Sequence, residues 1–303
     1  MHRRHFVLGL SATLAAAPLQ ARDKAPPRYA GAIALEKLER QAGGRLGAFV
    51  FDPAGNRGFG WRGRERFAMC STFKLSLAAM MLREVDAGRL NGAEVLPYAA
   101  LDVLPNSPVS GAHAGEGGMT ALVLAQAAQE TSDNLAANLV LRRLGGPPAL
   151  TQFWRSLGDE VSRLDRYETA LNRVGPGEEL DTTAPEAIAS SVARFLLGDA
   201  LSPASRDLLL GWMARTQTGL GRIRAGLPTG WRAGDKTGTA FIPGYSAKLN
   251  DIAVAFPPSG SPLIVTAFYE PAGDVQAGRP QDDAVLAAVG GIAADGKSWK
   301  LKR

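Results

Sequence analysis

Apolar residues near the two ends of the chain form short runs that predict β-strands. Residues 46–51 and 58–61 are two such runs, and the turn-forming stretch 52–56 (Asp-Pro-Ala-Gly-Asn) between them favours a hairpin. Three further runs of this kind occur only after residue 230, at 235–241, 251–256 and 262–269. The predicted sheet is therefore assembled from both ends of the chain.

Between these runs, apolar residues recur every three to four positions, which is typical of helices that bury one face. A first helix is expected at 28–41, where Gly43 and Gly44 end the pattern, and a closing helix at 282–294. The other expected helices lie in the middle of the chain, at 71–86, 119–129, 133–144, 149–157, 184–197 and 202–214.

This order of elements predicts an α/β (α+β) fold with two lobes. A five-stranded antiparallel sheet flanked by helices is expected to form one lobe, and an inserted set of helices the other. We expect one domain over 22–303, with the α/β lobe at about 28–63 and 215–296 and the helical lobe at about 64–214. Small-molecule sites favour clefts between lobes, so a functional site is expected where the two meet.

The first 21 residues predict an export signal. A twin arginine at 3–4 precedes an apolar run over 6–19, and small residues fit cleavage after Ala21. The run is shorter than the roughly 20 apolar residues that cross a bilayer, which argues against a membrane anchor. No cysteine precedes Cys70, which argues against a lipoprotein. We therefore expect twin-arginine export to a bacterial periplasm.

Composition and charge place few further constraints on partners. The chain has 303 residues, 46% hydrophobic and 21% charged, as in ordinary globular proteins. Its formal net charge is +5, which falls to +3 without Arg3 and Arg4 and is too mild to indicate nucleic-acid binding. We expect a monomer without a nucleic-acid partner. The basic C-terminal residues are interpreted as a solvated tail: Lys297, Lys300, Lys302 and Arg303.

Cysteine and histidine are too scarce for several common catalytic sites. Cys70 is the only cysteine, so no intramolecular disulfide can form, and we interpret it as a buried apolar residue. His113 is the only histidine outside the predicted export signal. The two fall short of a catalytic zinc shell, and a Ser-His-Asp triad would have to use His113. We expect chemistry with neither metal nor cofactor.

Ser71 and Lys74 form the first candidate catalytic pair. They are three residues apart at the start of a predicted helix, so they share a face and the lysine nitrogen can reach the hydroxyl. A serine hydroxyl needs a neighbouring base to become nucleophilic, and free N–H groups at a helix start can stabilise an oxyanion. Taken alone, the pair is better explained by a helix-capping serine and a solvent-facing lysine.

Two tripeptides change that interpretation: Ser132-Asp133-Asn134 and Lys236-Thr237-Gly238. Each is expected by chance only about once in 10⁴ positions. Separately, the first fits a helix cap and the second a strand lysine followed by a turn glycine. Together with the Ser-Lys pair, in this order and each at the edge of an element, they favour one shared site.

The three motifs together resemble those of the penicillin-recognising serine enzymes, for which they are the known signature in class A β-lactamases and penicillin-binding proteins. The resemblance covers nearly the whole chain after the export signal and implies the β-lactamase/transpeptidase-like fold. It implies that Ser71 is the acylated nucleophile and Lys74 its proton partner. It also implies that Ser132 passes a proton to the leaving β-lactam nitrogen and that Asn134 binds the substrate amide.

The same resemblance assigns the substrate carboxylate to the third motif. Lys236, Thr237 and Thr239 would face that carboxylate, with Gly238 between them on the predicted strand. The backbone N–H groups of Ser71 and Thr239 would form the oxyanion hole. Some class A enzymes also use an arginine here, and the spacing from Lys236 aligns Arg222 with it. The alternative for Arg222 is a surface arginine on a loop.

A fourth stretch separates the two kinds of relative. Residues 166–172 (Arg-Tyr-Glu-Thr-Ala-Leu-Asn), followed by Asp181, resemble the class A Ω-loop, and their span fits the 6–16 residues of such loops. The resemblance implies that Glu168 and Asn172 hold the deacylating water and that Arg166 pairs with Asp181. Penicillin-binding proteins lack this base and stay acylated. The alternative is that Glu168 and Arg166 form an ordinary surface pair.

Two positions depart from the family pattern. Ala240 stands where carbapenem-hydrolysing members carry the partner cysteine of Cys70, and Asn106 stands where many members carry an aromatic wall residue. We expect a serine β-lactam hydrolase acting in antibiotic resistance, with substrate range and the choice of Lys74 or Glu168 as acylation base left open. The alternatives are a peptidoglycan DD-peptidase and a non-catalytic β-lactam sensor.

Overall fold

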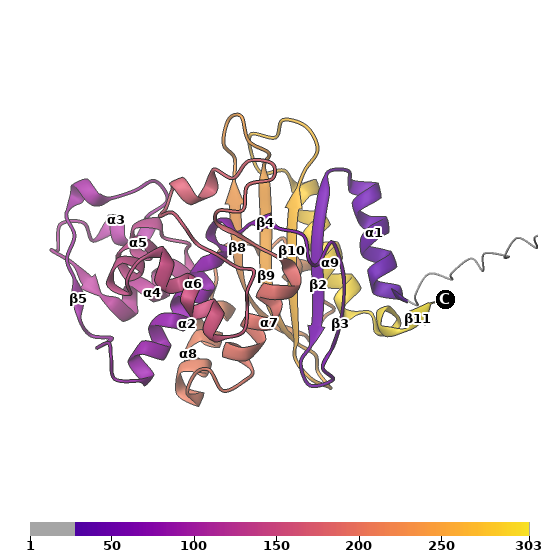
Figure 1. The fold of residues 1–303 in the computed structure, drawn as a ribbon, viewed down its shortest axis with the longest axis horizontal. Helices are drawn as coiled ribbons and strands as arrows, with labels where there is room; N and C mark the ends of the chain where they lie inside the picture. Colours follow the sequence, from indigo (N-terminus) through magenta and orange to yellow (C-terminus); the bar gives the residue numbers. More distant parts are fainter. Residues whose placement is uncertain (1–27, 303) are drawn as a thin grey trace, which may run out of the picture.

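The computed structural model describes residues 28–302, and a five-stranded antiparallel sheet lies at its centre (Figure 1). The strand order is β3-β2-β10-β9-β8, so strands from the two ends of the chain are adjacent. The predicted sheet and its antiparallel arrangement are therefore confirmed. The strands are β2 (Arg45–Asp52), β3 (Arg57–Trp61), β8 (Arg232–Ala240), β9 (Lys248–Phe256) and β10 (Leu263–Glu270).

The sheet is buried on both faces because successive side chains of a strand point in opposite directions. In β2, Ala48 and Val50 pack in one core together with Leu35 of α1 (Ala30–Ala42). Phe49 and Phe51 pack into the other core, on the face covered by α7 (Pro185–Leu196). Helix α9 (Pro280–Ala294) joins α1 on the first face.

A second group of helices surrounds α2 (Phe73–Asp86), to the left of the sheet in Figure 1. Residues 73–82 of α2 are all buried, as expected for a helix that is apolar on every side. The neighbouring helices are α4 (Ala121–Glu130), α5 (Asn134–Arg143), α6 (Pro147–Ser156) and α8 (Pro203–Ala214). Each predicted helix is present, with ends shifted by a few residues.

The structure adds elements that are too short to leave a periodic pattern. One is α3 (Pro108–Ala112). Three small antiparallel sheets pair β1 (Arg28–Tyr29) with β11 (Leu301–Lys302), β4 (Phe67–Ala68) with β7 (Thr182–Thr183), and β5 (Val95–Leu96) with β6 (Met119–Thr120). Single 3₁₀ turns lie at Cys70–Thr72, Ala100–Asp102, Ala170–Asn172, Ile223–Gly226 and Gly296–Trp299.

The basic C-terminal stretch was interpreted as a solvated tail, which is wrong for its backbone, because that backbone is paired in a small sheet. Strand β11 pairs with β1, placing Lys302 opposite Arg28. The ring of Trp299 anchors the stretch, because it meets the edge of Phe59 at a centroid separation of 4.8 Å. The side chains of Lys297, Lys300 and Lys302 do face solvent.

The predicted export signal at 1–21 and the basic residue Arg303 lie outside the described residues. Between residues 28 and 302, none of the helices has the length and apolar character needed to cross a membrane. The same range contains no cluster of three or more histidine, cysteine, aspartate or glutamate side chains arranged to hold a metal ion.

Candidate active site

Ser71 lies in a tight 3₁₀ turn just before α2, and β8 runs directly against this turn. The preceding residue, Cys70, adopts a left-handed backbone with φ of 46°, an uncommon conformation that often occurs at functional sites. Gly238 of β8 allows the close approach, since a Cβ there would lie 2.6 Å from the carbonyl oxygen of Met69. The glycine of the third motif is thus required by packing.

Two polar side chains meet at the Ser71 hydroxyl. Lys74 Nζ lies 3.0 Å from Ser71 Oγ, and Glu168 Oε1 lies 3.2 Å from the same atom. Lys74 Nζ and Glu168 Oε1 are themselves 2.9 Å apart, and neither side chain is exposed. Glu168 is therefore not half of a surface ion pair with Arg166, so that alternative is wrong.

Lys74 also binds the second motif. Its ammonium donates hydrogen bonds to Asn134 Oδ1 at 2.6 Å and to the Ser132 carbonyl at 2.9 Å. Complete burial lowers the pKa of Lys74, while the nearby Glu168 carboxylate opposes this shift. A lysine whose neutral form is more accessible than usual can accept a proton from a neighbouring hydroxyl.

Ser132 Oγ lies between two lysines. Lys236 Nζ donates to it at 3.1 Å, and Lys74 Nζ is 3.5 Å away. Ser132 has a φ of 61°, so the backbone here is also left-handed. Burial, followed by repulsion from the Lys74 cation, lowers the pKa of Lys236 to about 7. The hydroxyl therefore lies beside one nitrogen, that of Lys236, which exchanges protons near neutral pH, and beside that of Lys74, whose pKa burial also lowers.

The middle residue of the second motif is structural. Asp133 caps α5, because its Oδ1 accepts a hydrogen bond from the Ala136 N–H at 2.9 Å. Its Oδ2 accepts bonds from the backbone N–H groups of Val109 and Ser110 at 3.0 and 2.8 Å. Asp133 therefore fixes α3 against α5, which holds Ser132 and Asn134 in place on either side of it.

The 166–181 stretch forms a closed loop around Glu168. Asp181 is fully buried at its neck and accepts hydrogen bonds from Arg166 Nε at 2.5 Å and from the Arg166 N–H at 3.0 Å. Asn138 of α5 clamps the Glu168 backbone, accepting from its N–H at 3.0 Å and donating to its carbonyl at 2.9 Å. Asn172 Nδ2 donates to Glu168 Oε2 at 2.7 Å. The sequence analysis missed Asn138, because in the sequence it is only a single polar residue within a largely apolar helix.

Arg222 is buried beneath β8, so the surface-arginine alternative is wrong. It donates to Thr239 Oγ1 at 2.8 Å and to the Asn250 carbonyl at 2.8 Å, and it pairs with Asp283 at 2.8 Å. Thr237 Oγ1 lies 2.7 Å from Thr218 Oγ1. Thr237 and Thr239 are thus oriented by hydrogen bonds from outside β8, beside Lys236.

A second residue missed by sequence reasoning is Asn250 of β9. Its Nδ2 donates to the carbonyl oxygens of Ala68 and Met69 at 2.8 and 3.1 Å, which ties the Ser71 turn to the sheet. Cys70 is buried with Ala68, Val174 and Ala240 in a small apolar cluster, so its interpretation as an apolar residue is confirmed. Burial raises the pKa of the Cys70 thiol to about 12.

Asn106 occupies the place predicted for a wall residue. Its backbone is left-handed, with φ of 57°, and its Nδ2 donates to the Ser132 carbonyl at 2.9 Å. Its own carbonyl accepts from the Asn134 N–H at 2.9 Å. Asn106 therefore binds the backbone of the second motif at both Ser132 and Asn134.

Comparison with known proteins gives one consistent result. Residues 32–296 match the model of the β-lactamase enzyme family. The chain is 43% identical over 282 residues to β-lactamase L2 of Stenotrophomonas maltophilia, covering 93% of this chain and 88% of that protein. It is 41% identical over 267 residues to β-lactamase OXY-2 of Klebsiella oxytoca, covering 86% of this chain and 88% of that protein.

Solved structures agree with these sequence relatives. A class A β-lactamase described as the last common ancestor of Gram-negative bacteria superposes with a TM-score of 0.81 at 48% identity, covering 87% of this chain and 97% of that one. A β-lactamase from Xanthomonas campestris gives a TM-score of 0.81 at 41% identity, covering 86% of this chain and 95% of that one. The chain belongs to the β-lactamase enzyme family, in its class A branch.

Proposed function

We propose that the protein hydrolyses β-lactam antibiotics through an ester on Ser71, and so confers resistance to them. The observation that carries this proposal is the buried Glu168 carboxylate, whose Oε1 lies 3.2 Å from Ser71 Oγ. A base this close to the ester oxygen can take a proton from a water molecule that is bound beside both groups. The named relatives in the family are β-lactamases, which supports the same activity.

In the acylation step, Ser71 Oγ attacks the lactam carbonyl and its proton passes to Lys74 or Glu168, both of which lie within hydrogen-bond distance. The carbon–nitrogen bond of the ring then breaks. Ser132 Oγ gives a proton to the departing nitrogen and is resupplied by the lysines beside it. The backbone N–H groups of Ser71 and Thr239 are assigned to the oxyanion.

In the deacylation step, Glu168 and Asn172 hold a water molecule against the ester. Glu168 takes one proton from that water, and the resulting hydroxide attacks the ester carbon. The bond to Ser71 Oγ then breaks, and the proton held by Glu168 returns to Ser71 Oγ, which restores the free enzyme. The Lys74 ammonium offsets the charge of the buried carboxylate before the proton arrives. No metal ion or cofactor takes part in this scheme.

Substrate binding is assigned to the opposite wall of the site. Lys236, Thr237 and Thr239 on β8 bind the substrate carboxylate, and Gly238 keeps that strand close to Ser71. Arg222 acts through Thr239, whose hydroxyl it orients at 2.8 Å. Asn134 binds the substrate amide. Without substrate, its Oδ1 accepts from Lys74 at 2.6 Å and its Nδ2 donates to the Pro105 carbonyl at 2.8 Å.

We also propose that residues 22–303 form one domain that works as a periplasmic monomer, without membrane or nucleic-acid partners. The twin arginine at 3–4 and the apolar run after it support export by the twin-arginine route. Replacing both arginines by lysine is expected to abolish the resistance of cells that express the gene, while the purified mature chain keeps its activity. Resistance retained by that double variant contradicts the assigned route.

The test of the main proposal is turnover of a chromogenic cephalosporin by the purified mature chain. Repeated turnover, with product far exceeding enzyme, supports hydrolysis. A single burst equal to the enzyme concentration would indicate a DD-peptidase or a β-lactam sensor instead, because both acylate and then stall.

A further inference from the structure

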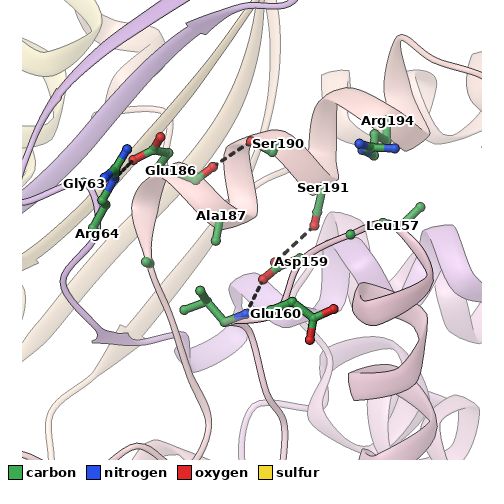
Figure 2. A pocket seen from close by; sticks show the side chains of 13 residues that line it. Gly63, Arg64, Leu157, Asp159, Glu160, Glu186, Ala187, Ser190, Ser191 and Arg194 are labelled. Carbon is green, nitrogen blue, oxygen red and sulfur yellow. Dashed lines mark hydrogen bonds and ion pairs between the residues drawn. The ribbon is translucent and has the colours of Figure 1, made fainter.

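A cavity of about 500 Å³ lies between α7 and the segment that follows α6, and it shares no lining residue with the Ser71 site (Figure 2). Its size is within the range of small-molecule pockets in proteins. Much of the wall is apolar and comes from both sides of the cavity: Leu157, Val161, Ala184 and Ala187.

The charged groups around this cavity leave one cation without a partner. Arg64 pairs with Glu186 at 2.9 Å, and Glu160 pairs with Arg155 at 3.4 Å. By contrast, no carboxylate within residues 28–302 lies at ion-pair distance from the exposed side chain of Arg194. Arg194 belongs to α7, and its guanidinium reaches the opposite side of the cavity, the segment after α6. A Cβ built on Gly158 of that segment would lie 3.8 Å from Arg194 Nη2.

Asp159 is buried and forms no ion pair with Arg194, and its carboxylate is held by hydrogen bonds from neutral groups. It accepts hydrogen bonds from the N–H groups of Val161 and Ser162 at 2.9 and 2.8 Å. It also accepts hydrogen bonds from Ser162 Oγ at 2.5 Å and from Ser191 Oγ of α7 at 3.1 Å. Figure 2 shows the second bond, which joins α7 to the segment that follows α6. Arg194 therefore offers an exposed guanidinium to an anionic group beside an apolar wall, while Glu160 and Glu186 are already paired with other arginines.

We propose that this cavity is a regulatory site for a small amphipathic monoanion, with its carboxylate or sulfonate against Arg194 and its apolar body over Leu157 and Ala187. Burial of the apolar body contributes about 25 cal/mol per Å² removed from water. The anionic group forms charge-assisted hydrogen bonds with the guanidinium, which Arg can make in pairs. The regulatory part of this inference rests on the proposed function.

A short chain of hydrogen bonds connects the cavity to the Ω-loop. Ser162, which Asp159 holds, lies with its Oγ 2.6 Å from Thr183 Oγ1 in β7. The Arg163 N–H donates to the Thr182 carbonyl at 3.0 Å. Asp181, the buried residue that closes the neck of the loop, directly precedes these threonines. An occupant that moves α7 away from Asp159 therefore acts on the neck of the loop that carries Glu168.

The binding test uses the mature enzyme without substrate and the fluorescence of anilinonaphthalene sulfonate. We expect saturable binding with a Kd on the order of 10 μM. Arg194→Gln is expected to weaken it about tenfold, since one charge-assisted contact is lost. Arg40→Gln, on an exposed arginine of α1, is the matched control and leaves the affinity unchanged. Ala187→Trp fills the cavity and abolishes binding.

The neutral counterpart phenylnaphthylamine separates charge from apolar contact. Its affinity is expected to fall with Ala187→Trp and to be indifferent to Arg194→Gln. Equal affinity of the sulfonate for the Arg194→Gln and Arg40→Gln variants, or binding that survives Ala187→Trp, overturns the site. Because these readouts need no catalysis, they are independent of the proposed hydrolysis.

Regulation is tested with the same probe at saturating substrate. A bound probe is expected to change kcat at least twofold in the parent and to leave kcat unaffected in Ala187→Trp. An identical kcat with and without saturating probe in the parent overturns the regulatory role.

Discussion

The Lys74 ammonium and the Glu168 carboxylate lie 2.9 Å apart in the protein interior, and both contact Ser71 Oγ. A buried charge is costly unless it is paired, so each group stabilises the ionised form of the other. The carboxylate of this pair can accept the Ser71 proton directly, whereas Lys74 can accept it only in the neutral form that burial favours. The other carboxylate oxygen, Glu168 Oε2, accepts a hydrogen bond from Asn172 Nδ2 at 2.7 Å.

Glu168→Ala is expected to form the ester on Ser71 and then to hydrolyse it at least about 10²-fold more slowly, because the deacylating base is lost. Intact-mass measurement after mixing with a penicillin should show the protein with one covalently added β-lactam. The double variant Ser71→Ala, Glu168→Ala is the control and should show no adduct. Parent-like turnover by Glu168→Ala contradicts the assigned role.

The activity is expected to depend on the protonation of Lys236. Its pKa is lowered to about 7 by burial and by the Lys74 cation, so the free enzyme loses this cation as the pH rises through 7. For a substrate with a carboxylate, kcat/KM should fall about fivefold between pH 7 and pH 8, as the protonated fraction falls. The methyl ester of the same substrate is the control and should show a smaller loss, because Lys236 then acts only in the proton supply to Ser132. A flat profile for both substrates would contradict the titration of Lys236 near pH 7.

The same pKa predicts an effect of Lys236 on stability. Its folded-state pKa lies below the unfolded value of 10.5, so between about pH 7 and 10.5 the unfolded chain binds more protons and stability rises with pH. The cost of the buried cation is complete below about pH 7. Lys236→Met is therefore expected to raise Tm at pH 6, and the gain should shrink by pH 10. A gain that is equal at both pH values would contradict the buried charge as its cause.

The main elements were predictable because their patterns are local. The strand at 46–51 alternates between two cores, and the helix at 71–86 carries an apolar run, so both signals lie within one segment. The short strand pairs carry no such signal. Phe67 and Thr183 are partners in β4 and β7, yet each strand is two residues long and the two lie far apart in the chain.

The site was predictable where a motif marks it and not where a contact between distant residues builds it. Ser71, Lys74, Ser132 and Lys236 lie together as the motifs indicated. Asn138 and Asn250, however, are single polar residues whose partners lie 30 and 182 residues away, at Glu168 and Ala68. Only the folded chain shows which backbone groups these amides bind.

Asn106 is expected to position Ser132 for proton transfer. Asn106→Gly tolerates the left-handed backbone but removes the side-chain hydrogen bond to the Ser132 carbonyl, so acylation should slow about tenfold. Deacylation should be unchanged, because the residues that hold Glu168 do not include Asn106. Stopped-flow measurement of both steps checks this split.

A matched control for Asn106 exists in the β2–β3 turn. Asn56 also has a left-handed backbone, with φ of 44°. Its turn leads into β3, the edge strand opposite to β8, and β8 is the strand that contacts the Ser71 turn. Asn56→Gly should leave both rates at the parent values. If Asn106→Gly slows both steps equally, the residue acts on the whole site and not through Ser132.

Gly238→Ala is expected to separate the Ser71 turn from β8. The new methyl group would lie 2.6 Å from the Met69 carbonyl and 3.1 Å from Cys70 Cβ, and backbone must move to relieve this contact. Overpacking of this kind costs about 1–3 kcal/mol, and a shift of about 1 Å at the nucleophile reduces the rate about 10²-fold. Chemical denaturation and kcat/KM measure the two effects. Gly115→Ala is the control, because no atom lies within 4 Å of a Cβ there, and it should change neither. Parent-like activity of Gly238→Ala would show that the turn tolerates a wider separation from the strand.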